Sequence, residues 1–98
     1  MEEKDEQAQL IEDIQRGEEA NKILEHPFVK SFFEDYEQGA FDIWKGISLK
    51  KVKEREEIFK YMQVTRKFKK HFESYISQGE VSKEILKDLT NEKKFGIF

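Results

Sequence analysis

The residues with the clearest chemical potential lie in one segment, RKFKKHFESY, residues 66–75. Four basic residues and His71 are interleaved there with Phe68, Phe72 and Tyr75. A groove for single-stranded nucleic acid uses this combination, because cations neutralise phosphates and exposed rings stack on bases. An amphipathic helix with a lysine-rich polar face has the same composition. The choice between the two therefore depends on whether the rings are buried.

Helical spacing favours burial of these rings. Phe68, Phe72 and Tyr75 are four and three residues apart, so on a helix they share one side. They extend a stripe that begins at Phe59 and Met62, and without this stripe so short a chain has almost no core. We therefore predict that the three rings are buried and that the neighbouring lysines form a solvated face.

Nucleic-acid binding is the alternative, with Lys67 and Lys70 as the phosphate contacts. Two observations argue against it. The isoelectric point is about 5.5, whereas nucleic-acid-binding domains are typically basic. The acidic N-terminal segment would also compete with phosphates for the same cations.

Catalytic chemistry has little support in the sequence. The two histidines, His26 and His71, lie in different segments and have no partner at a recognisable spacing. No glycine-rich phosphate loop and no H-E-x-x-H motif occurs. The absence of cysteine excludes disulfides, a thiol nucleophile and thiolate metal sites. We predict a protein that is not an enzyme, with no catalytic residues, no cofactor and no metal.

Composition indicates a single small domain with a thin core of large side chains. Apolar residues make up 37% and charged residues 40% of the 98 residues, and nine of the apolar residues are Phe. No apolar run approaches the roughly 18 residues that a membrane span needs. The acidic start, MEEKDEQAQ, differs from the basic start of a signal peptide. We expect no membrane partner and a location in the cytoplasm of the producing cell.

Charge is unevenly distributed along the chain. Residues 1–25 carry nine acidic and three basic groups, whereas residues 49–71 carry nine basic and three acidic groups. Two such segments can pair within one molecule or between copies, or can mark the surface for a charged partner.

Apolar spacings of three and four recur throughout, and no alternating pattern indicates a strand. We predict an all-α fold, an antiparallel helical hairpin with flanking N-terminal and short C-terminal helices. The first helix covers residues 3–25 with an interruption at Gly17, and the second runs from Pro27 to about 45. The third covers 49–78 and ends at Gly79, and a short fourth covers 81–89. In domain terms, an acidic, flexible arm (1–17) precedes a helical domain (18–92) and a C-terminal tail (93–98).

Specific contacts follow from this arrangement. Arg55 lies near the apolar stripe of the third helix, from which it either forms an ion pair with Glu34, Asp35 or Asp42 or stays exposed. Two helices cannot cover both apolar stripes completely, so we expect the chain to associate with itself. The candidate interaction residues are aromatic: Phe28, Phe33, Phe41, Trp44, Phe95 and Phe98.

Four segments carry a resemblance to a known family: EEANKILEHPF, FDIW, KEREEIF and ISQGEVSKEIL. Together they resemble small helical proteins of tailed bacteriophages. The matching positions are Ala20, Leu24, Pro27, Trp44, Arg55, Glu56 and Gly79. The chain departs from the family in its lysine-rich helix connection, and in Val81 and Ser82, where a small alanine is usual after the glycine.

The resemblance implies a gene among the head, portal and packaging genes, and a product without established catalytic chemistry. Our first hypothesis is therefore a protein-interaction and assembly protein of a phage virion or its assembly pathway. It would act in the host cytoplasm or in the virion, and its partners would be itself and another phage or host protein. One alternative is a small DNA-associated factor of packaging or transcription that uses the basic face of the third helix. Another is a host-directed inhibitor that mimics nucleic acid through the acidic N-terminal segment.

Overall fold

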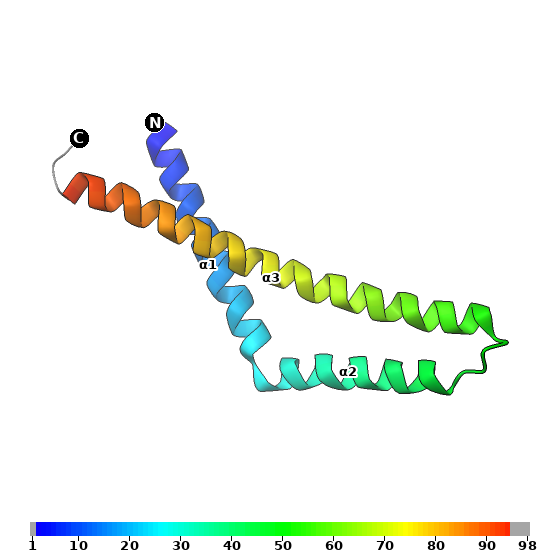
Figure 1. The fold of residues 1–98 in the computed structure, drawn as a ribbon. Helices are drawn as coiled ribbons and strands as arrows, with labels where there is room; N and C mark the ends of the chain where they lie inside the picture. Colours follow the sequence, from blue (N-terminus) through cyan, green and yellow to red (C-terminus); the bar gives the residue numbers. More distant parts are fainter. Residues whose placement is uncertain (1, 95–98) are drawn as a thin grey trace. The chain divides into compact units, whose positions relative to one another are not determined.

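A computed structural model describes residues 2–94, which form three α-helices and no strand (Figure 1). Helix α1 spans Glu2–Glu25, α2 spans Pro27–Gly46 and α3 spans Val52–Lys94. The predicted all-α class is confirmed. The chain divides into two compact units. The hairpin unit contains Leu24–His71, and the crossing unit combines Met1–Ile23 with Phe72–Phe98.

The predicted junction between the first two helices is confirmed at His26. Its backbone is extended, with φ −61° and ψ 127°, as expected for a residue that precedes proline. The ring Nδ1 of His26 accepts a hydrogen bond from the backbone N–H of Phe28 at 3.2 Å. His26 therefore caps α2, and Pro27 occupies the first turn, where its missing N–H costs nothing.

The hairpin unit pairs α2 with the first half of α3 in opposite directions (Figure 1). Arg55 of α3 contacts the carbonyl of Trp44 late in α2, whereas Arg66 contacts Glu37 earlier in α2. The two Arg66–Glu37 hydrogen bonds, 2.7 and 3.0 Å long, lie on one edge of the pair. The predicted antiparallel hairpin is thus confirmed.

Helix α3 begins three residues later than predicted. Ser48 organises the turn before it, because its Oγ accepts from the backbone N–H of Lys50 and its carbonyl from that of Lys51. The carbonyl of Lys51 accepts from the N–H of Arg55 and closes the first helical turn. Ser48 is therefore a turn residue, and the helix begins at Val52.

The predicted breaks at Gly17 and Gly79 are wrong, because α1 and α3 run through them without interruption. The predicted short helix at 81–89 is the continuation of α3. The two glycines permit a close helix crossing instead. A Cβ on Gly17 would lie 2.9 Å from the backbone oxygen of Tyr75, and one on Gly79 would lie 3.0 Å from that of Asp13. Any larger residue would force the two backbones apart.

A polar side chain lies at the centre of this crossing. Ser82 is completely buried, and Ala20 is 4% exposed. The Oγ of Ser82 donates to Oδ2 of Asp13 at 3.0 Å, and Gln9 donates to Oδ1 of the same carboxylate at 3.0 Å. A buried hydroxyl with a charged acceptor is fully satisfied, so it adds geometric specificity to the close contact.

The predicted burial of the aromatic stripe is wrong, because Phe68 and Tyr75 are exposed and Phe72 is half-buried. Met62 is buried, but Phe68 is 60% exposed and Phe59 is 48% exposed. The side of α3 that faces α2 contains Arg55, Ile58, Met62 and Thr65, at helical spacing. Phe59 and Phe68 lie on either side of this line. In the crossing unit, Phe72 is half-buried and Tyr75 is 38% exposed.

Candidate interaction surface

The hairpin unit exposes a continuous set of large apolar side chains, here called the aromatic face. Four come from α2 and three from α3, and each set recurs at intervals of three, four or seven residues, which places it on one side of its helix. All seven are between 38% and 70% exposed. The members are Phe28, Phe32, Tyr36 and Ile43 of α2, and Tyr61, Val64 and Phe68 of α3.

Ring contacts join the two halves of this face. The rings of Phe32 and Tyr36 lie 6.1 Å apart, and those of Phe32 and Phe33 meet edge to face at 5.6 Å. Phe33 reaches across to Phe68 of α3, with 6.5 Å between ring centroids. Rings held by their neighbours lose little additional freedom on binding, so such a cluster is suited to contact another protein.

A second aromatic group surrounds the start of α3. The rings of Phe41 and Trp44 stack at 6.1 Å, and the guanidinium of Arg55 lies 4.4 Å from the Trp44 ring centroid. Arg55 Nη1 also donates to the carbonyls of Ile47, at 3.0 Å, and Trp44, at 3.4 Å. The predicted ion pair of Arg55 is therefore wrong. Arg55 instead binds the carbonyl of Trp44, which also accepts from the backbone N–H of Ile47, and the carbonyl of Ile47, the residue that caps the end of α2.

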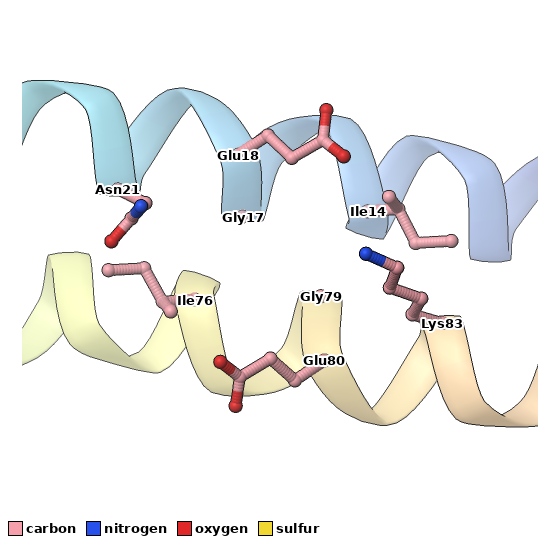
Figure 2. A pocket seen from close by; sticks show the side chains of 8 residues that line it. All are labelled: Ile14, Gly17, Glu18, Asn21, Ile76, Gly79, Glu80 and Lys83. Atoms are coloured by element: carbon pink, nitrogen blue, oxygen red, sulfur yellow. The ribbon is translucent and has the colours of Figure 1, made fainter.

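The helix crossing encloses a small pocket of about 230 Å³ beside the glycines. Figure 2 shows Gly17 and Gly79 on the facing sides of α1 and α3, with Ile14, Asn21 and Ile76 lining the gap. Its polar groups are an amide, an ammonium and two carboxylates, from Asn21, Lys83, Glu18 and Glu80. These groups include no pairing of a nucleophile with a base, and the pocket is best described as a packing feature of the crossing.

In the crossing unit, the pKa of the Asp13 carboxyl group is shifted. Its hydrogen bonds from Gln9, Ser82 and Gln78, together with nearby Arg16, lower the pKa of the carboxyl from its ordinary value of 3.8, while desolvation opposes the change. Hydrogen bonds to the ionised form cause this direction of shift. In the hairpin unit, the hydrogen bond and charge of Glu25 raise the pKa of Lys30. Both shifts reflect structural contacts.

The predicted site residues occupy different environments. Phe28 belongs to the aromatic face, Phe41 is 42% exposed, and Phe33 and Trp44 are half-buried. Lys67 and Lys70 are exposed on α3. Phe95 and Phe98 lie outside the described residues. The roles of these residues in binding stay predictions.

Sequence reasoning missed two features. Phe32 and Ile43 of α2 are more than half exposed, although they are not among the interaction residues predicted from the sequence. The side-by-side contact of Gly17 and Gly79 was also missed, although two helical glycines outside a turn context are a signal for close helix packing.

The described residues contain neither a candidate metal site nor a helix that could cross a membrane. Within this part of the chain, no group of three or more His, Cys, Asp or Glu side chains is arranged to hold a metal ion. Among the described helices, none has the combination of length and apolar character that a membrane crossing requires. No protein-family model, curated protein or solved structure matches the chain.

Proposed function

We propose that this chain is a non-enzymatic protein-interaction and assembly protein that associates through the aromatic face. The observation that carries the proposal is the exposure of this face in a chain with so small a core. Phe28 is 70% exposed and Ile43 58% exposed. Contiguous apolar surface of this kind is costly in water and usually marks a protein contact.

The chemistry of the remaining surface supports a binding role. The pocket at the start of α3 is lined largely by apolar side chains, including Trp44, Val52 and Phe59. Among the described residues, Asp13 and Lys30 have shifted pKa values, and each shift comes from hydrogen bonds that hold the fold, whereas a catalytic site needs such a group in a cleft beside a second reactive group.

The biological setting that we propose is the assembly pathway of a tailed bacteriophage, in the host cytoplasm or in the virion. The resemblance of the segments around Pro27, Trp44 and Arg55 to small phage proteins supports this setting. Purification of phage particles followed by peptide mass spectrometry tests it. Detection of the chain at stoichiometric copy number supports a virion role.

The association itself is testable by sedimentation velocity at micromolar concentration. We expect the wild-type chain to have at least twice the monomer mass of 11.8 kDa. Tyr61→Ser combined with Val64→Ser should shift it towards the monomer while the helical circular dichroism is kept. Leu49→Ser is the matched control, since Leu49 is 80% exposed but lies in the connection between helices. A monomeric wild type would contradict the proposal.

The second candidate is a DNA-associated factor, and one observation favours it. The exposed Phe68 lies next to Lys67, which is the arrangement that a stacking platform for single strands requires. A gel shift that weakens with salt and disappears in Lys67→Glu with Lys70→Glu would support this candidate. The absence of a shift at low salt would exclude it.

A further inference from the structure

Two rows of opposite charge in this chain have the same spacing. The acidic row consists of Asp5, Glu12 and Glu19 of α1, and the lysine row consists of Lys53, Lys60 and Lys67 of α3. All six residues are exposed. Seven residues are nearly two helical turns, so each row follows one side of its helix with charges about 10.5 Å apart. Equal spacing allows one row to pair with the other in register, as charges do along paired helices.

The acidic row borders an apolar groove in the crossing unit. Glu12 and Glu19 line a cavity of about 390 Å³ together with Gln15, Arg16 and the side chains of Ala20, Ile23, Phe72 and Tyr75. Arg16 Nη2 pairs with Glu12 Oε1 at 2.7 Å, whereas Lys22 Nζ lies 3.8 Å from Glu19 Oε1. The groove is therefore suited to an apolar side chain, with Glu19 beside it as the more weakly paired carboxylate.

The lysine row has the complementary character. Tyr61 and Val64, which belong to the aromatic face, are 51% and 64% exposed and lie beside Lys60 and Lys67 on α3. Glu56 and Glu57 lie between Lys53 and Lys60, so this side of α3 offers apolar groups and regularly spaced cations with two carboxylates among them. A partner surface that carried acidic groups without an apolar groove would pair with the lysines but would leave Tyr61 and Val64 exposed.

We propose that the groove of one copy receives Tyr61 and Val64 of a second copy, with the lysine row of that copy against the acidic row. This inference rests on the proposed self-association and names its partner. Each contact between two copies joins the groove of one chain to the lysine row of the other. Exposed ion pairs contribute little energy each, so they set register and orientation while the apolar groups provide most of the affinity.

Charge reversal distinguishes this dimer from other arrangements. The first variant carries Asp5→Lys, Glu12→Lys and Glu19→Lys, and the second carries Lys53→Glu, Lys60→Glu and Lys67→Glu. Each variant alone places like charges against each other, so we expect its association to weaken by about tenfold or more. An equimolar mixture restores both contacts, and it should therefore sediment as a dimer. Within a single chain, pairing of the two rows would be lost in both variants and would not return on mixing.

Control variants keep the change in charge but leave the rows intact. Asp35→Lys, Glu80→Lys and Glu84→Lys match the first variant, and Lys50→Glu, Lys83→Glu and Lys87→Glu match the second. Both control variants should sediment with the same assembly mass as the wild-type chain. Circular dichroism checks folding of every chain, and the milder Asp5→Asn, Glu12→Gln and Glu19→Gln replaces the first variant if that chain unfolds.

Three results would overturn the inference. Reversed variants that stay associated would reject the row pairing alone and leave self-association standing. Variants that dissociate but fail to combine on mixing would reject the second copy as the occupant of the groove. A monomeric wild type would reject the inference together with the proposed function.

Discussion

At the scale of single residues, Gly17 and Gly79 are helical positions that have no room for a side chain. The backbones of α1 and α3 approach at Gly17 and Gly79, where an added methyl group would meet backbone atoms at 2.9–3.0 Å. Backbone atoms cannot rotate away as a flexible side chain can. Glycine therefore costs helix stability locally and is compensated by close packing and by the buried Ser82 contact.

Gly17→Ala and Gly39→Ala form a matched pair for this constraint. Both positions lie inside helices, and alanine gains about 1 kcal/mol of helix propensity at each. A Cβ on Gly39 meets nothing within 4 Å, so Gly39→Ala should raise the melting temperature. Gly17→Ala should lower it, because the helices must separate. Equal melting shifts in thermal scans would contradict the close crossing.

Asp13 should give the crossing unit a measurable pH dependence. Its pKa is lowered in the folded chain, so the ionised carboxylate stabilises the fold above the ordinary value of 3.8. That contribution is lost as the pH falls through the lowered pKa. We expect Asp13→Asn to be less stable than wild type at neutral pH, with the difference closing below 3.8. Urea unfolding as a function of pH measures this difference. A stability difference between wild type and Asp13→Asn that stays constant into strong acid would contradict this prediction.

At the scale of elements, the end of α2 is held by an arginine from α3. Arg55 donates to two carbonyls at this end and stacks on Trp44, so it connects the end of α2 with the beginning of α3. An arginine serves here because its planar guanidinium can donate and stack at the same time, whereas the ammonium of a lysine cannot. The hairpin therefore depends on contacts that helix propensity does not supply.

Arg55→Ala should destabilise the hairpin by about 1–2 kcal/mol, since carbonyls at a helix end lose a charged donor. Arg55→Lys should recover less than half of this loss, because the stacking on Trp44 is not replaced. Lys50→Ala is the control for removing a nearby exposed cation, because Lys50 is exposed and lies outside the lysine row. The readouts are chemical denaturation and the fluorescence of the single Trp44. Full recovery of stability in Arg55→Lys would show that only the positive charge of Arg55 stabilises the hairpin.

The course of α3 was predictable only in part. Helical spacing, Pro27 and Gly46 predicted the ends of α1 and α2 to within a few residues, because proline and a terminal glycine act locally. Gly79 was expected to end a helix for the same reason, and it does not. Local propensity penalises such a glycine by only about 1 kcal/mol, which a favourable helix crossing can offset.

At the scale of the whole molecule, the exposed aromatic face and the two charged rows have different salt dependence. Ion pairs between exposed charges weaken as the Debye length shortens from about 10 Å at 0.1 M salt to about 3 Å at 1 M. Burial of apolar surface does not weaken in this way. The proposed dimer therefore combines a salt-sensitive and a salt-insensitive contribution.

We expect the dissociation constant of the wild-type dimer to rise several-fold between 0.05 and 0.5 M salt, and then to level off. The reversed-row mixture should show the same profile, since its charges are exchanged but equal in number. Sedimentation equilibrium at several salt concentrations measures both. A wild-type constant that does not change with salt would indicate association through the aromatic face without the charged rows.

The sequence by itself determined the all-α class, the junction at Pro27 and the antiparallel order of the hairpin, because these depend on residue spacing and on local backbone chemistry. It also contained the spacing of seven in both charged rows. Only the tertiary structure decided which side of each helix is covered. That choice depends on contacts between distant residues, such as Arg66 with Glu37 and Gly17 with Gly79, and these contacts leave Phe68 at the surface.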